Sequence, residues 1–231
     1  MLGMNGTVYT DCTGMGEGNV TTAKDTALLC SELAKYKNLT PYLTCWLDTV
    51  RDGKAELVNL NRLVRTYKGV TGMKAWGSEK AGSCIAATAE KGDMSVCVVL
   101  NGCDSQEDMN AEAKKLLNLA FDTYEIYTPE LPEDMVKETV VCGGEELSVK
   151  LAPEGLYPIV IPRGTYRMVE CDFTAEEKLD APVKNGETAG EIRYTMGGEV
   201  ILEGKIVACK EVKKMNFICG IKKLVYNLLS M

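Results

Sequence analysis

Nucleophilic catalysis is the first chemistry to look for in this sequence, since it contains serines, lysines and cysteines but no histidine. A serine hydroxyl becomes a good nucleophile when a base lies within reach, and the motif S-x-x-K places a lysine amine one helical turn away. No serine in the 231 residues begins S-x-x-K. We therefore expect no catalytic residue of this type within the chain. Tyr36-Lys37-Asn38 is interpreted as the end of a helix.

Metal chemistry is also disfavoured by the distribution of cysteines. The ten cysteines include no C-x-x-C pair, whereas zinc sites need paired thiolates or imidazoles at short spacing. We expect no metal site and no cofactor. Cys84 and Cys97 lie within apolar runs, where thiols behave as small buried hydrophobic groups. Disulfides remain possible, but we expect most thiols to be free.

Charge excludes one class of partner. The formal charge is −7, and binding to nucleic acid needs a dense basic surface. The charge is uneven, because the segment from Lys205 to the end has six lysines and one acid, a net +5, which leaves −12 for the rest. The pattern is that of an acidic body with a basic tail, and we expect no nucleic-acid partner.

Two helices and a hairpin are predicted in the first half of the chain. Thr22 and Asp25 form a capping-box pattern that opens a helix. Residues 83–89 and 94–100 are apolar runs joined by a short polar turn, which predicts an antiparallel hairpin. Ser105 and Asp108 form a second capping box. It opens a helix whose apolar stripe indicates core packing and comprises Met109, Ala113, Leu116, Leu117, Ala120 and Phe121.

The composition changes at residues 128–134, where TPELPED indicates a linker. Short β-rich runs broken by Gly and Pro follow, and their spacing predicts a small β-sandwich. The segment 213–231 then has helical periodicity. Its expected apolar face comprises Phe217, Ile221, Leu224 and Leu228, and Lys222 and Lys223 lie away from that face. Such a helix either binds a membrane interface or docks on its own protein, and the pattern alone favours neither.

Targeting signals are missing from the sequence as given. It begins MLGMNGTVYT, without a basic region followed by an apolar one. No run reaches the roughly 18 apolar residues of a membrane span. These features by themselves indicate a cytoplasmic protein.

Residues 59–102 carry a resemblance to a known family. In the low-molecular-mass penicillin-binding proteins, which are serine-type D-alanyl-D-alanine carboxypeptidases, Asn-Thr-Asn-x-Leu-Leu leads to Gly-x-x-Gly-Leu-Lys-Thr-Gly and then to Ala-Gly and two apolar strands. The matching residues here, in order, are Asn59, Asn61, Gly69, Gly72, Met73, Lys74, Ala81 and Gly82. Upstream, LGMNGTVYTDCTGM and VTTAKDTALL are similar to family segments, as are EAKKLLNLAF, VKLAPEGLYPIVIPRG and LDAPVKNGETAGEIRY downstream.

The resemblance implies acyl transfer. In the family, the serine of S-x-x-K attacks the D-Ala-D-Ala bond, an oxyanion hole stabilises the intermediate, and water releases the acyl group. Penicillin acylates the same serine. A second family motif, S-x-N, helps proton transfer and substrate positioning, and it too is absent from this sequence. The Lys-Thr-Gly motif lies on an edge strand and recognises the terminal carboxylate of the substrate. The implied partners are peptidoglycan stem peptides ending in D-Ala-D-Ala, β-lactams, and a membrane surface bound through the C-terminal helix.

The third motif departs from the family pattern. Lys74-Ala75-Trp76 replaces Lys-Thr-Gly, so the threonine hydroxyl is lost and a large ring takes the place of glycine. Ser78 could supply a hydroxyl from a shifted position. We expect Lys74, Ala75, Trp76 and Ser78 to form the substrate-binding site. Without the resemblance, Lys74 is a solvated lysine on an edge strand.

The sequence thus predicts an α+β protein: a partial penicillin-binding, β-lactamase-like domain at 1–126, a β-sandwich at 127–212 and an amphipathic anchor at 213–231. The resemblance implies an N-terminally truncated D-Ala-D-Ala carboxypeptidase, inactive alone, at the extracytoplasmic face of the bacterial membrane. The alternative is a non-catalytic binding protein of the cell wall or membrane. The altered Lys-Thr-Gly position favours that alternative, and the matching flanks favour the enzyme.

Overall fold

The computed structural model describes residues 2–14, 16, 18–133, 135, 137–217 and 221. It divides into two compact units, residues 1–125 and 126–231. Each unit has its own hydrophobic core.

A three-stranded antiparallel sheet forms the centre of the first unit. Its strands are β3 (Val70–Ser78), β4 (Gly82–Lys91) and β5 (Met94–Cys103), in the order β3-β4-β5. The predicted hairpin at 83–89 and 94–100 is confirmed as β4 and β5. In this order β3 is an edge strand, and no other strand of the described residues pairs with its outer side.

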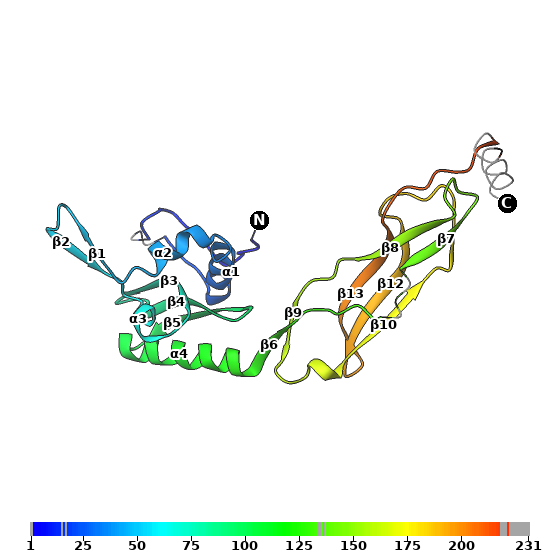
Figure 1. Ribbon diagram of the computed structural model, residues 1–231. Coiled ribbons are helices and arrows are strands. Elements are labelled where there is room, and N and C mark those ends of the chain that lie inside the picture. Colours follow the sequence, from blue (N-terminus) through cyan, green and yellow to red (C-terminus); the bar gives the residue numbers. More distant parts are fainter. Residues whose placement is uncertain are drawn as a thin grey trace. The chain divides into compact units, whose positions relative to one another are not determined.

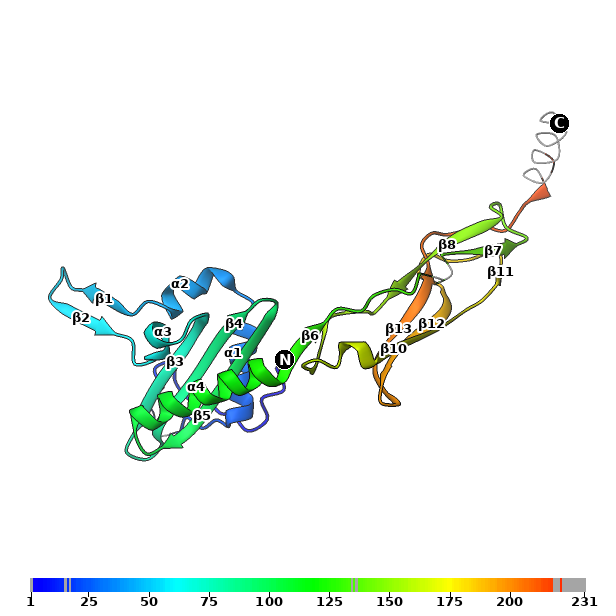
Figure 2. The same ribbon diagram turned by 60° about the horizontal axis from the view of Figure 1, so that its bottom comes forward.

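A long helix and a shorter one cover the two faces of this sheet (Figures 1 and 2). Helix α4 (Gln106–Thr123) packs with Met109, Ala113, Leu117 and Phe121 onto the face that carries Ile85. Helix α1 (Ala23–Leu33) packs on the other face. The two helices therefore bury both faces of the sheet. Since successive strand residues point to opposite faces, the middle strand must be apolar on both sides, and it contains the alanine-rich run from Ile85 to Ala89.

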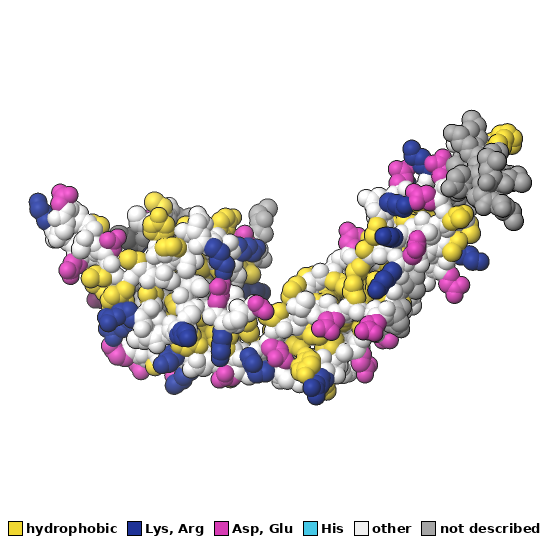
Figure 3. All heavy atoms as spheres, viewed as in Figure 1, with side chains coloured by type: hydrophobic (Ala, Val, Ile, Leu, Met, Phe, Trp, Pro, Cys, Tyr) yellow, Lys and Arg dark blue, Asp and Glu magenta, His cyan; other side chains and the backbone are white. Residues whose placement is uncertain are grey.

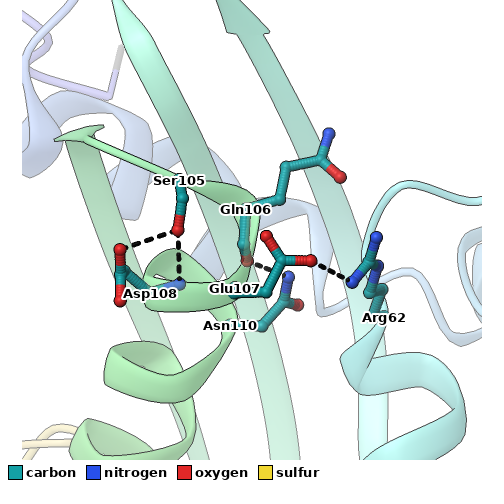
Figure 4. Close-up of polar contacts among 6 residues, drawn as sticks. All are labelled: Arg62, Ser105, Gln106, Glu107, Asp108 and Asn110. Atoms are coloured by element: carbon teal, nitrogen blue, oxygen red, sulfur yellow. Dashed lines mark hydrogen bonds and ion pairs between the residues drawn. The ribbon is translucent and has the colours of Figure 1, made fainter.

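Both predicted helix starts are confirmed. The Thr22 hydroxyl accepts a hydrogen bond from the Asp25 amide at 3.1 Å and so caps α1. At α4, Ser105 Oγ accepts from the Asp108 amide at 3.0 Å and donates to Asp108 Oδ2 at 2.7 Å (Figure 4). These bonds satisfy backbone donors that have no partner within the helix.

The remaining elements of this unit are short. A hairpin that the sequence analysis missed consists of two four-residue strands, exposed along most of their length. Its turn contains Arg51 and Asp52 at φ near +55°, a conformation that non-glycine residues seldom adopt. The short elements are η1 (Lys37–Leu39), α2 (Thr40–Leu43), β1 (Leu47–Val50), β2 (Ala55–Val58) and α3 (Leu63–Thr66).

The second unit consists mostly of strands. After β6 (Tyr124–Tyr127), which pairs with β9, a six-stranded mixed sheet runs in the order β10-β12-β13-β8-β7-β11. The strands are β7 (Glu138–Cys142), β8 (Ser148–Glu154), β9 (Ile159–Pro162), β10 (Val169–Ala175), β11 (Lys178–Asp180), β12 (Thr188–Met196) and β13 (Glu199–Ala208), with a short helix η2 (Tyr166–Met168) between β9 and β10.

This unit differs from a sandwich of two separate sheets. The first residues of β8 pair with β7 and its last residues pair with β13, so a single sheet continues through β8. Side chains from β7, β8, β11, β12 and β13 nevertheless share one core. Tyr194 lies in this core, and its hydroxyl donates to the Glu130 carbonyl at 2.9 Å. Burial is the main cause that raises the pKa of Tyr194 above its usual value.

The surface of each unit mixes the two signs of charge, as the face in Figure 3 shows. The ion pairs are exposed, for example Arg193 with Glu191 at 2.8 Å and with Glu203 at 3.2 Å. Exposed pairs of this kind contribute about 0–1 kcal/mol each. The stability of both units therefore rests on their cores.

The predicted C-terminal anchor falls largely outside the described residues. Leu224, Leu228, Lys222 and Lys223 all lie outside them. Of its expected apolar face, Phe217 is 82% exposed and Ile221 is 46% exposed. Among the described residues, no helix is long and apolar enough to span a membrane.

Candidate active-site pocket

A cavity of about 670 Å³ lies in the first unit where β3 meets α1 and the loop before it. Lys74 comes from β3 and Leu29 from α1. The loop supplies the remaining lining residues, which are Tyr9, Thr10, Asp11, Cys12, Thr13 and Gly14. The cavity thus combines one cation, an apolar side chain and a polar loop.

Lys74 extends from the edge strand on the face of the sheet that carries α1. It lies opposite Ala86, and Trp76 lies opposite Cys84 on the same face. Lys74 is exposed and has no ion-pair partner among the described residues. Its ammonium group can therefore bind an anion that enters the cavity without first breaking an ion pair.

Asp11 holds the loop in shape. Its Oδ1 accepts from the Thr13 amide at 2.7 Å, the Thr13 hydroxyl at 2.6 Å and the Gly14 amide at 2.7 Å. Its Oδ2 accepts from Gly16 N at 2.9 Å and Asn19 Nδ2 at 2.6 Å. The hydrogen bonds from the Thr13 and Asn19 side chains are the leading causes that hold the pKa of Asp11 well below its usual range. The carboxylate is fully used as an acceptor, so its role is to shape the loop.

The loop is tied to α1 at its base. Backbone hydrogen bonds of 2.9 Å join Val8 and Val20 in both directions. Buried Asp25, in the first turn of α1, accepts from the Gly6 amide at 2.8 Å and the Thr7 hydroxyl at 2.7 Å. The residues that cap and open α1 therefore also position the wall of the cavity.

The Asn59 and Asn61 motif holds the segment before β3 in place. Asn59 Oδ1 accepts from the Asn61 amide at 2.9 Å, and Asn59 Nδ2 donates to the Cys45 carbonyl at 3.0 Å. These bonds fix the chain between the exposed hairpin and β3. The motif thus precedes the strand that presents Lys74.

The structure brings only one of the four expected site residues into the cavity. Lys74 lines it. Ala75 is buried on the opposite face of the sheet, in the core beneath α4. Trp76 packs on Cys30, Met73 and Ala86. Ser78 lies at the end of β3, where its Oγ accepts from the Ala81 amide at 3.1 Å and so closes the turn to β4.

The sequence analysis missed the loop and Leu29 as site residues. The segment LGMNGTVYTDCTGM was recognised as similar to the family, but no chemistry was assigned to it. The available signal was its polar, glycine-rich composition directly before a helix cap. Such loops, held by a rigid scaffold, commonly line binding sites.

The arrangement suits recognition of a peptide carboxylate. A β-strand edge can accept an extended peptide through main-chain hydrogen bonds. Lys74 then places a positive charge beside that edge, and a hydrogen bond between charged groups is about twice as strong as a neutral one. The site therefore fits an extended peptide that ends in a carboxylate.

Two family models match the chain in succession. The family described as D-alanyl-D-alanine carboxypeptidase matches residues 1–104, and the C-terminal domain of penicillin-binding protein 5 matches residues 121–214. The first match contains the whole cavity, and the second covers most of the strand-rich unit.

Individual relatives agree with these matches. D-alanyl-D-alanine carboxypeptidase DacF of Bacillus subtilis is 30% identical over 96% of this chain and 58% of its own length. DacC of Escherichia coli is 28% identical over 94% of this chain and 54% of its own length. The chain thus spans somewhat more than half the length of these relatives.

The fold agrees as well. Penicillin-binding protein 5 of Haemophilus influenzae superposes with a TM-score of 0.76 and 23% identity, covering 92% of this chain and 63% of that protein. Its likeness supports the fold, and the sequence matches carry the family assignment. The chain belongs to the D-alanyl-D-alanine carboxypeptidase family of low-molecular-mass penicillin-binding proteins.

Proposed function

We propose that this chain is the substrate-recognising part of a serine-type D-Ala-D-Ala carboxypeptidase that removes the terminal D-alanine of peptidoglycan stem peptides. The observation that carries the proposal is the position of Lys74, on an edge strand and in the wall of a cavity. The family's carboxylate-binding lysine is expected at this position. The matched relatives are named as enzymes of the same activity.

In this proposal each part of the cavity has a separate task. The outer edge of β3 binds the backbone of the stem peptide as an added strand. Lys74 binds the terminal carboxylate, and the loop held by Asp11 limits the space for the last D-alanine. β-Lactams, which carry a carboxylate of their own, occupy the same cavity. Orientation by such contacts accelerates the reaction when the reacting atoms are also in place.

The nucleophile has to come from outside these 231 residues, since they contain no S-x-x-K. Removing the nucleophile of a serine enzyme typically costs several orders of magnitude in rate. We therefore propose that the chain alone neither releases D-alanine nor forms a covalent adduct with penicillin.

A binding protein without catalysis is the second candidate, and a specific observation favours it. Ala75 has no hydroxyl and is buried on the far face of the sheet, and Trp76 packs under α1. Neither can take the part of threonine in Lys-Thr-Gly. Recognition of the carboxylate by Lys74 alone can suffice for binding while the rate of hydrolysis is low.

A chimera separates the two candidates. The part of Bacillus subtilis DacF that the match leaves out is joined to this chain, and D-alanine release and labelling by fluorescent penicillin are measured. The enzyme proposal predicts release and labelling by the chimera, and neither by the chain alone. A chimera that is labelled but releases no D-alanine supports the binding protein. A covalent band with the chain alone contradicts our account of the nucleophile.

We also propose that the segment 213–231 holds the protein at the outer, anionic face of the bacterial membrane. Two exposed apolar side chains, Phe217 and Ile221, support this proposal, as does the net positive charge from Lys205 to the end. Apolar burial and basic residues add to each other at such an interface. The alternative is that the same segment docks on its own protein.

A further inference from the structure

Cys30 of α1 and Cys97 of β5 lie together in the first unit. Cys30 is only 4% exposed and Cys97 is half-buried. Both belong to the cluster that joins α1 to the sheet, with Met73 and Ala86 as its other central members. Each thiol shifts the pKa of the other, which agrees with their place in one cluster.

The fold explains why these thiols meet. Cys97 lies opposite Thr88 in the ladder between β4 and β5, on the face of the sheet that carries α1. On the helix, Leu29 lines the cavity, and the next residue, Cys30, is buried against the sheet. Helix α1 packs against β5 with Cα atoms within 8 Å. A disulfide needs Cα atoms about 4.4–6.8 Å apart, a separation that residues of two elements packed this closely can reach.

We propose that Cys30 and Cys97 are a redox pair that forms a disulfide and so joins α1, which lines the cavity, to β5. The oxidant is a low-molecular-weight disulfide. In the first step, the thiolate of one cysteine attacks the small disulfide, forms a mixed disulfide and releases one small thiolate. In the second step, the other cysteine loses its proton, attacks the mixed disulfide and releases the second small thiolate. Two protein thiols and one small disulfide become one protein disulfide and two small thiols.

The interaction between the two thiols changes the pKa of both. The interaction with Cys97 lowers the pKa of Cys30, while the same interaction, followed by burial, raises the pKa of Cys97. The thiolate is the attacking form of a cysteine. Cys30 is buried, so the small disulfide reaches it when α1 opens locally.

The disulfide has a consequence for the cavity. Leu29 precedes Cys30 on α1 and lines the cavity that Lys74 also lines. A bond from Cys30 to β5 fixes α1 on the sheet and with it the distance between these two walls. This inference does not depend on the proposed function, because it concerns the thiols and the stability of the unit.

The test uses the full chain, equilibrated in mixtures of reduced and oxidised glutathione. Remaining thiols are alkylated under denaturing conditions, and the protein is digested with trypsin. A Cys103→Ser background removes the other cysteine of the tryptic peptide 92–114. We expect peptides 25–35 and 92–114 to be linked with the loss of two hydrogens. The melting midpoint of the first unit should rise by on the order of 10 °C.

Matched variants assign the effect. Cys30→Ser and Cys97→Ser should each abolish the link and the rise in midpoint, whereas Cys45→Ser, at an exposed thiol, should change neither. If Cys30 and Cys97 are both fully alkylated after equilibration with excess oxidised glutathione, the proposal is wrong. A rise in midpoint that persists in a folded Cys30→Ser variant also contradicts it. The peptide result on the Cys103→Ser chain stands even if a serine variant fails to fold.

Discussion

Asn61 Nδ2 donates a hydrogen bond of 3.3 Å to the carbonyl oxygen of Gly72, two residues before Lys74. Asn61 is fully buried, at 0% exposure, and its Oδ1 accepts from the Leu63 amide at 3.1 Å. One side chain thus joins the start of α3 to the strand that carries the cavity lysine. Buried amides that satisfy backbone groups in this way are costly to remove.

Asn61→Ala should lower the free energy of unfolding of the first unit by about 1–3 kcal/mol, because the Gly72 carbonyl and the Leu63 amide lose their partner. Asn101→Ala, at an exposed position of β5, should change it by less than about 0.5 kcal/mol. Chemical denaturation of both variants measures the difference. Equal stability of the two would show that Asn61 does not hold β3 in place.

The cap of α4 gives a second prediction. Ser105→Ala should lower the free energy of unfolding of the first unit by about 0.5–2 kcal/mol, since it removes the acceptor of the hydrogen bond from the Asp108 amide. Glu107→Gln, which breaks only the exposed ion pair with Arg62 at 2.8 Å (Figure 4), should cost less than about 1 kcal/mol. Thermal melts of both variants give the comparison. If Glu107→Gln lowers the melting midpoint more than Ser105→Ala does, the ion pair stabilises α4 more than the cap, and our account of these two contacts is wrong.

Parts of this architecture could be predicted because local patterns determine them. The Thr22 and Ser105 caps, the hairpin of β4 and β5, and most of the stripe of α4 each follow from residues close in sequence. Leu116 was expected in that stripe and is instead exposed. The site was harder to predict. The loop at Asp11 and Lys74 line one cavity although they lie some sixty residues apart in the sequence, and the family motif alone identified Lys74.

Two other features depend on long-range packing as well. The continuous sheet of the second unit depends on β8 pairing with two partners, which its own sequence does not specify. The burial of Ala75 on the far face follows from the register of β3 with β4. The prediction placed Lys74, Ala75 and Trp76 in one site. Neighbouring side chains of a strand point to opposite faces, so the three could not all face the cavity.

Asp11 gives a prediction about pH. Its pKa in the folded chain is held below the unfolded value of about 3.9. Its contribution to stability is therefore fully present above that value and is lost as pH falls through the folded pKa. The native chain should melt at a higher temperature than the Asp11→Asn variant. This difference in melting midpoint should be constant above about pH 5 and become smaller below about pH 4. A difference that is unchanged from pH 6 to pH 2 would show that the carboxylate is not stabilised by its hydrogen bonds.

The membrane proposal is tested by charge reversal. Replacing both Lys222 and Lys223 by Glu should lower partitioning onto anionic vesicles by at least about tenfold, because each basic residue contributes roughly 1 kcal/mol near such a surface. High salt should weaken binding of the native chain. The matched control reverses Lys178 and Lys184, both exposed on the second unit. Co-sedimentation with vesicles is the measurement, and equal sedimentation of the full chain and of a chain without 213–231 would remove the anchor from the account.

The central claim, that Lys74 recognises the terminal carboxylate of D-Ala-D-Ala peptides, is tested most directly by a double-mutant cycle in binding. Calorimetry compares a peptide ending in D-Ala-D-Ala with its C-terminal amide, on the native chain, on Lys74→Met and on the control Lys54→Met in the exposed hairpin. The account predicts that the native chain and the control prefer the acid by about tenfold or more, because a hydrogen bond to a charged group contributes roughly 1.5–3 kcal/mol. Lys74→Met should bind the acid and the amide equally. A preference for the acid that survives in Lys74→Met, or a native chain that does not distinguish the two peptides, would contradict it.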